Sequence, residues 1–101
     1  MKNTSYKYTV LAAAIAAVFS TNSNALALGA SANDTGANST AIGDVSQATG
    51  GNSVAVGRGA AAQGTDSTAI GSGSWAKGED SVAIGATATA STGSIAIGTL
   101  S

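Results

Sequence analysis

Residues 40–43 read Thr-Ala-Ile-Gly, and a similar tetrapeptide returns every fourteen residues along the chain. The series is Leu26-Ala27-Leu28-Gly29, Thr40-Ala41-Ile42-Gly43, Val54-Ala55-Val56-Gly57, Thr68-Ala69-Ile70-Gly71, Val82-Ala83-Ile84-Gly85 and, after a last step of thirteen residues, Ile95-Ala96-Ile97-Gly98. A unit this short cannot bury its own apolar side chains and must stack on its neighbours to form a continuous core. The period therefore predicts a solenoid.

Small residues alternate with variable ones in the rest of each unit. Counted from the tetrapeptide glycine, the third, fifth and seventh residues are almost always Ala, Ser or Gly, whereas the fourth and sixth vary. Alternation with period two is typical of a strand, and the small set is expected to face inward. A turn follows, with the pairs Asn38-Ser39, Asn52-Ser53, Asp66-Ser67 and Asp80-Ser81. Their side chains are expected to accept local backbone hydrogen bonds and favour a tight reversal.

Each unit therefore reads as strand, turn, strand, turn, which predicts an all-β fold with two parallel sheets back to back. Stacked units should lie about 4.7–4.9 Å apart. A helical reading fails because Gly recurs twice per unit and Ala alternates with Ile or Val at period two. The tetrapeptide strand has Thr, Val or Ile on one face and Ser, Ala or Gly on the other, and the pattern does not say which face fills the roll. Since neither face is polar enough for water, we expect oligomerisation; the alternative is a monomeric roll with a flat face of small residues.

The first 25 residues form a separate region. Two lysines precede an apolar run, Val10–Phe19, and Ser23-Asn24-Ala25 has small residues at the two positions that a signal peptidase reads. The run is shorter than the roughly 20 residues that a helix needs to span a bilayer. We therefore expect residues 1–25 to be a signal peptide cleaved after Ala25. A membrane anchor and cleavage after Ala27 are the alternatives.

The remaining residues, 26–101, carry two basic and five acidic side chains, a net charge of −3. Because no basic patch is present, nucleic acid is not expected as a partner. The chain lacks cysteine, so it is not a disulfide-stapled scaffold. Side chains as small as Ala and Ser bury little apolar area, at about 25 cal/mol per Å², against a backbone entropy of about 1–2 kcal/mol per residue. We expect a marginal monomer, and disorder of the isolated chain is the alternative.

On these residues the sequence resembles the head repeats of trimeric autotransporter adhesins, the YadA-like head family. The hallmark of that repeat is S-x-A-x-G followed by x-x-(A/S)-x-A-x-G, which Ser39–Gly50, Ser53–Gly64 and Ser67–Gly78 match closely. The likeness covers about residues 26–98. It implies a left-handed parallel β-roll that forms a homotrimer on a Gram-negative surface. It also implies binding to host extracellular matrix, to a host cell-surface protein or to other bacterial cells.

Two features depart from the family pattern. One residue is missing between Gly85 and Ser94, and Thr92 stands where a glycine is expected, so the last unit should be distorted or act as a cap. Adhesins of this family continue into a coiled-coil stalk and a C-terminal membrane anchor, and neither these nor a membrane span is expected within residues 26–101. The exported chain is then expected on the outer membrane if joined to an anchor and otherwise secreted. A truncated fragment without function is the alternative.

No catalytic residue, metal or cofactor is expected. The chain has no His or Cys, and its adjacent carboxylates, Glu79 and Asp80, fall in a predicted exposed turn. Asp66 and Asp80 share a column and could attract a weakly bound cation, but the nonapeptide of calcium-binding rolls is missing. Arg58 is expected to pair with Asp44 in the neighbouring unit.

The outward face of the first strand offers the candidate ligand contacts. Trp75 is the only aromatic residue of 26–101 and is expected to be exposed, with Lys77 two residues further on and Gln63 in the preceding unit. Exposed aromatic side chains beside a cation are typical of recognition sites. The alternative role of Trp75 is to cover the surface of the roll or a trimer seam. An ice-binding solenoid is a further alternative, although Thr40 and Thr68 alternate with valines.

Overall fold

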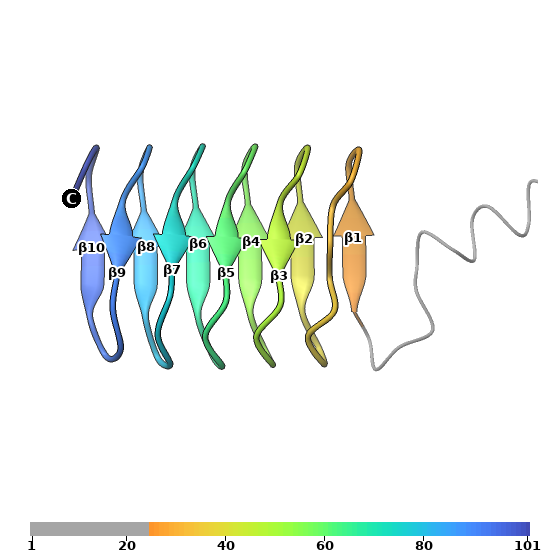
Figure 1. Ribbon diagram of the computed structural model, residues 1–101, viewed down its shortest axis with the longest axis horizontal. Helices are drawn as coiled ribbons and strands as arrows, with labels where there is room; N and C mark the ends of the chain where they lie inside the picture. Colours follow the sequence, from red (N-terminus) through yellow and green to blue (C-terminus); the bar gives the residue numbers. More distant parts are fainter. Residues whose placement is uncertain (1–24) are drawn as a thin grey trace, which may run out of the picture.

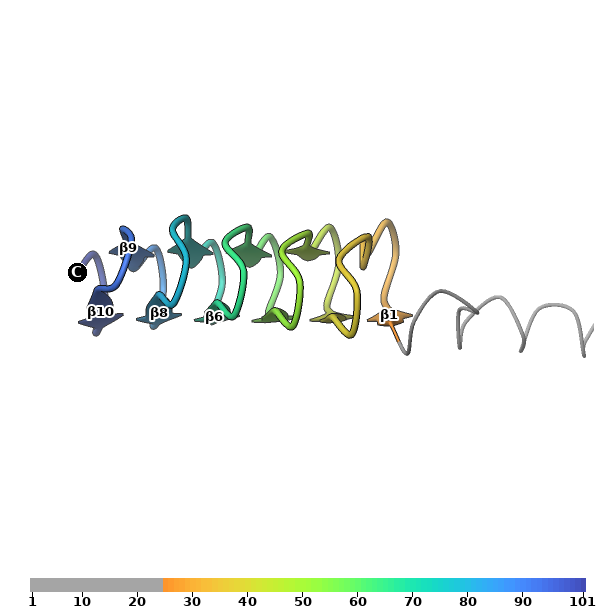
Figure 2. The same cartoon turned by 90° about the horizontal axis from the view of Figure 1, so that it is seen from below.

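A computed structural model describes residues 25–101, which form a β-solenoid of about five turns without helices. The expected signal peptide lies outside these residues apart from Ala25. Figure 1 shows the strands stacked in parallel along one axis, and Figure 2 shows that they form two layers. Sheet A contains β1 (Leu26–Leu28), β2 (Thr40–Ile42), β4 (Val54–Val56), β6 (Thr68–Ile70), β8 (Val82–Ile84) and β10 (Ile95–Ile97). Sheet B contains β3 (Gln47–Ala48), β5 (Ala61–Ala62), β7 (Trp75–Ala76) and β9 (Thr89–Ala90).

The chain alternates between the two sheets, as the period predicts. A sheet A strand is followed by the upper corner (residues 43–46 and their equivalents), a sheet B strand and the lower corner (residues 49–53 and their equivalents). Each such circuit is one rung. All strand pairs are parallel, and Ala41 lies opposite Ala55 in the neighbouring rung, fourteen residues on. An isolated bridge between Asn33 and Gln47 extends the sheet B pairing into the first rung.

From the second rung on, the interior of the roll contains only small side chains. The middle residue of each central sheet A strand and the second residue of each sheet B strand are buried alanines, and serines fill the corners. The buried alanines and serines from the second rung on are Ala41, Ala48, Ala55, Ala60, Ala62, Ala69, Ala76, Ala83, Ala88, Ala90, Ser39, Ser46, Ser53, Ser67, Ser74 and Ser81. The face of sheet A that carries Thr, Val and Ile is therefore the outer one, which decides the alternative that the pattern left open.

The corner serines do not accept backbone hydrogen bonds, contrary to expectation. The Ser53 hydroxyl donates to the Gly50 carbonyl at 2.6 Å, and the other lower-corner bonds of this kind follow the same three-residue spacing. The Asn side chains of this corner bond along the stack: Asn38 Nδ2 donates to Asn52 Oδ1 at 3.3 Å, and Asn52 Nδ2 donates to Asp66 Oδ1 at 3.0 Å. The backbone of these turn residues is left-handed, with φ of 55° at Asn52. The column thus links rungs to one another.

Glycine is required at both corners by the closeness of the next rung, and at the upper corner also by its backbone conformation. At the upper corner, Gly43 has a φ of 125°, a conformation that side chains disfavour, as expected, and an added Cβ would lie 2.7 Å from Gly57 O. At the lower corner, Gly50 has no such φ, but an added Cβ would fall within 3.0 Å of the backbone of Gly64 in the next rung. Here the rungs approach so closely that only a hydrogen atom fits.

The last rung loses a residue without losing its register. β10 pairs with β8, and Ile95 lies opposite Val82, thirteen residues apart. The loss is taken up in the lower corner, where Gly93 has the left-handed backbone (φ 66°) that Asp80 has one rung earlier. The Ser94 hydroxyl donates to the Ser91 carbonyl at 2.7 Å, as Ser81 does to Gly78. Strand β10 is therefore not distorted, and only the turn before it differs.

Candidate ligand-binding face

The structure brings Trp75, Lys77 and Gln63 together on the outer face of sheet B. Trp75 lies in β7 and is 40% exposed, as expected. Its Nε1–H donates to Gln63 Oε1 at 2.9 Å, and Lys77 Nζ lies 4.6 Å from the ring centroid. The backbone fixes this arrangement, because Gln63 N donates to Ala76 O at 2.9 Å and holds the two rungs in register. We call these three residues the Trp75 cluster.

Two interactions within the Trp75 cluster occupy groups that a ligand could otherwise use. The indole N–H is used by Gln63, and a cation over an exposed aromatic ring contributes only about 0.5–1 kcal/mol. The donors that remain for a ligand are the Gln63 amide nitrogen and the Lys77 ammonium. Together with the ring they favour a ligand rich in carbonyl or carboxylate oxygens.

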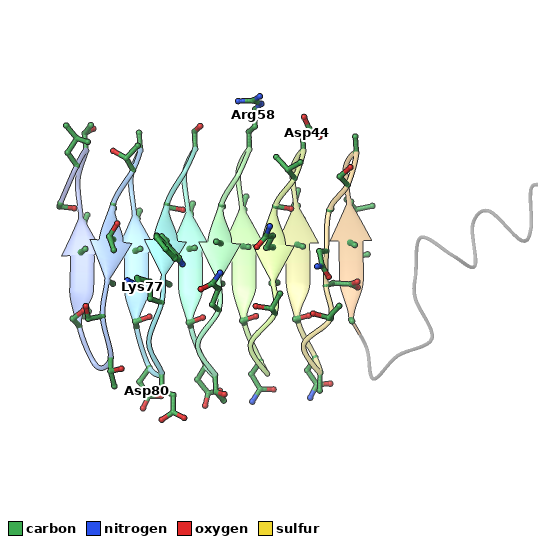
Figure 3. The ribbon with its side chains drawn as sticks, in the orientation of Figure 1. Asp44, Arg58, Lys77 and Asp80 are labelled. Atoms are coloured by element: carbon green, nitrogen blue, oxygen red, sulfur yellow. The ribbon has the colours of Figure 1, made fainter. Side chains whose placement is uncertain are left out.

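The exposed acidic side chains of the described residues lie at the corners of the roll, as Figure 3 shows for Asp44 and Asp80. Asp44 and Arg58 are close at the upper corner, with Arg58 Nε 3.9 Å from Asp44 Oδ2, which confirms the expected pair. Both side chains are more than half exposed, at 77% and 51%, so the pair contributes at most about 1 kcal/mol. Asp80 lies at the opposite corner in Figure 3. The sheet B strands therefore carry no carboxylate, and the cation Lys77 directly follows β7.

Other kinds of site are missing from the described residues. Residues 25–101 contain no pocket and no group of three or more His, Cys, Asp and Glu that could hold a metal ion. Asp66, Glu79 and Asp80 are exposed at the lower corner. Within the same range no helix is long and apolar enough to cross a membrane.

The outer face of sheet A is a second candidate surface. Two columns run along it, formed by the first and third residues of every strand: Leu26, Thr40, Val54, Thr68, Val82 and Ile95, and Leu28, Ile42, Val56, Ile70, Ile84 and Ile97. Ile42 and Ile70 are 37% and 38% exposed, and Ile97 at the end of the stack reaches 65%. One continuous apolar face is therefore open to solvent in the single chain.

Sequence reasoning missed two unusual residues. Val45, at the upper corner, is exposed and has a left-handed backbone (φ 51°), which is strained for a β-branched side chain. The equivalent residues Gly59 and Gly73 could have revealed this conformation. Asp34 stands where later rungs have an inward alanine, and its Oδ2 atom is buried without a hydrogen-bond partner. The sequence did contain a sign of this, because Asp34 is the only charged residue in a column of alanines.

Ala25, the expected cleavage residue, is buried and lies immediately before β1. Cleavage after it would leave every residue of β1 in the mature chain.

Comparison with known families gives one match. The model of the "YadA head domain repeat (2 copies)" matches residues 35–60, 62–88 and 76–101, well over half of the chain. No curated protein sequence matches the chain.

Proposed function

The chain belongs to the YadA head domain repeat family, and from this we propose that it is the head of a trimeric autotransporter adhesin. Its role is attachment, without catalysis, to host extracellular matrix, a host cell-surface protein or other bacterial cells. The observation that carries the proposal is the division of the roll into an apolar outer face on sheet A and a polar outer face on sheet B. One face suits self-association and the other suits a ligand.

The surface that the single chain exposes supports homotrimerisation through sheet A. Continuous exposed apolar patches mark protein interfaces, and the two columns of sheet A extend over all six strands. Three rolls packed side by side around a common axis would cover these columns. The buried area would then offset the small contribution of an interior made of alanine and serine. An isolated roll has no such compensation.

With sheet A covered, sheet B and its Trp75 cluster remain on the outside of the trimer. Each trimer would present three copies of the cluster, one per chain. A single cluster offers few contacts, so binding of one copy should be weak. Several copies on one trimer, and many trimers on one cell, convert weak contacts into stable attachment by raising the effective concentration.

The proposal includes export. Residues 1–25 act as the signal peptide, with cleavage after Ala25, and residues 26–101 form the head region, within which no stalk or membrane anchor is proposed. Joined to an anchor, the head is displayed on the outer membrane of a Gram-negative bacterium. Without one it is secreted.

The test is adhesion by a displayed head. The chain is fused to a trimerising stalk and an outer-membrane anchor, displayed on a non-adherent bacterium, and assayed on matrix-coated surfaces, on host cells and for aggregation. The variants are Trp75→Ala and the matched control Gln47→Ala, which removes an exposed polar side chain from the same face. Trp75→Ala should reduce attachment about tenfold, in line with the loss of a recognition hot spot, and Gln47→Ala should not.

The outcomes separate the two parts of the proposal. A correctly folded, displayed trimer that attaches to nothing contradicts the adhesin function. Attachment that is equally strong in both variants contradicts only the role of the Trp75 cluster and moves the contact elsewhere on the head.

A further inference from the structure

The outer face of sheet B is an open polar surface with two columns of side chains. The columns are Asn33, Gln47, Ala61, Trp75 and Thr89, and Thr35, Thr49, Gln63, Lys77 and Ser91. All of these residues are exposed except Ala61, which is partly exposed. Apart from Ala61, Trp75 and Lys77, every member has an uncharged amide or hydroxyl group. The face therefore offers many hydrogen-bond donors and acceptors around a single aromatic ring.

This face lacks the features that small molecules and peptides use. Small molecules bind mainly in concave sites, and residues 25–101 contain no pocket. A peptide that adds a strand needs an open sheet edge, but β7, which carries Trp75, is already paired with β5 and with β9. Helical and proline-rich peptides need an apolar or aromatic-lined groove. An open face of amides and hydroxyls instead suits a ligand that presents many hydroxyl groups, as a glycan chain does.

The Trp75 cluster has the groups that a sugar with a carboxylate requires. The face of an indole ring is electron-rich, so it attracts the weakly positive C–H groups on the face of a sugar ring. The Gln63 Oε1 atom accepts the indole N–H at 2.9 Å, which leaves the Gln63 amide nitrogen to donate to a sugar oxygen. Lys77 supplies a positive charge, and the sheet B strands carry no carboxylate that would compete for it.

We propose that the Trp75 cluster binds a glycan chain that carries spaced carboxylate groups, such as those of uronic acids. One sugar ring packs on the indole, and the Lys77 ammonium pairs with a carboxylate. In the free chain Lys77 Nζ lies 4.6 Å from the ring centroid, but this contact is weak and the lysine stem is flexible, so the ammonium can turn to the ligand. The net charge of −3 over residues 26–101 disfavours a densely charged polyanion. This inference rests on the proposed function, because it names the ligand of the same cluster.

Tryptophan fluorescence tests the ligand directly, because Trp75 is the only tryptophan of the chain. The exported chain, fused to a trimerising stalk without tryptophan, is titrated with three probes. A hyaluronan hexasaccharide has sugar rings and carboxylates, chitohexaose has sugar rings only, and a hexapeptide of alternating glycine and glutamate has carboxylates only. The variants are Lys77→Gln and the matched control Arg58→Gln, which remove the two cations of residues 26–101 one at a time and change the net charge equally. Both side chains are exposed, and circular dichroism compares the fold of the variants.

The proposal predicts that the hexasaccharide changes the Trp75 fluorescence at millimolar concentration. It should bind about tenfold more weakly to Lys77→Gln, the effect expected when one hydrogen bond to a charged group is lost, and unchanged to Arg58→Gln. Chitohexaose should bind about tenfold more weakly than the hexasaccharide and equally to all three proteins. No response to the hexasaccharide, an equal response to the peptide, or equal losses in the two variants would overturn the proposal.

Attachment of the displayed head, with the free hexasaccharide as competitor, separates this inference from the proposed function. Competition should reduce attachment if the glycan is the ligand. Attachment that the hexasaccharide leaves unchanged would overturn the glycan ligand and leave the adhesin function standing. A positive titration together with a displayed trimer that attaches to nothing would support the ligand and contradict the adhesin function.

Discussion

The adjacent glycines Gly50 and Gly51 provide a direct test of how closely the rungs approach. A Cβ at position 50 would overlap the Gly64 carbonyl group and lie 2.9 Å from Gln63 O. A Cβ at position 51 would meet only Thr65 Cγ2, at an ordinary 3.9 Å, and neither glycine has a left-handed φ. Both substitutions to alanine add the same methyl group to the same turn. Only Gly50→Ala should lower the stability of the roll.

The cost of Gly50→Ala follows from the movement it forces. The two rungs must separate locally by on the order of 1 Å, and overpacking of this kind costs about 1–3 kcal/mol. The same movement breaks the bonds that Thr49 N and Gly50 N donate to Ala62 O, at 3.0 and 3.3 Å, for about 1 kcal/mol each. The total is about 3–5 kcal/mol, a large part of the stability of a small domain. Gly51→Ala should instead gain about 0.4–1 kcal/mol, because alanine restricts the unfolded chain.

Urea unfolding followed by far-ultraviolet circular dichroism measures both effects. The variants must be compared at one protein concentration, since assembly adds to the apparent stability. Free energies of unfolding that agree within about 1 kcal/mol between Gly50→Ala and Gly51→Ala would refute the close approach of rungs at this corner.

Three further substitutions have signed expectations in the same unfolding assay. Val45→Gly should stabilise the chain by up to about 1 kcal/mol, because relief of the left-handed backbone (φ 51°), about 1–2 kcal/mol, exceeds the roughly 0.4–1 kcal/mol that glycine adds to the freedom of the unfolded chain. A loss of stability would contradict that strain. Ser53→Ala should lower the free energy of unfolding by about 1 kcal/mol, because the Ser53 hydroxyl donates to Gly50 O at 2.6 Å. Ser67→Ala should leave it nearly unchanged, because the buried Ser67 hydroxyl has no partner. Equal losses in the two variants would contradict this difference. Asp34→Ala should stabilise by about 1–3 kcal/mol, because it removes a buried carboxylate oxygen that lacks a partner, and a destabilised variant would show that the carboxylate is paired.

The sequence was sufficient to predict the path of the chain. The fourteen-residue period and the alternation of small residues, such as Ser46, Ala48 and Gly50, lead to the two sheets and to the inward set of sheet B. The outward positions of Trp75 and Lys77 follow from the same alternation. These features depend only on the spacing of residue types along the chain, which can be read from one sequence.

Features that depend on the distance between neighbouring rungs could not be predicted. Both faces of β4 are compatible with burial, and Ala55 is the inward residue because an interior of alanine and serine is too narrow for valine. Gly43 and Gly50 are both required because the backbone of the next rung leaves no room for a Cβ, and Gly43 is required also for its left-handed φ. The hydrogen bond from Asn52 to Asp66 also requires the register between rungs. In each case a contact with the next rung decides the role of the residue.

Sedimentation equilibrium of the exported chain, combined with circular dichroism on the same sample, tests the central claim most directly. The matched variant is Ile70→Ser, which replaces a half-exposed apolar side chain in the middle of the sheet A face. The account predicts a strand-rich particle of three times the mass of one chain, and a weaker or absent trimer for the variant. A strand-rich monomer, or a trimer that Ile70→Ser leaves unchanged, would contradict assembly through sheet A.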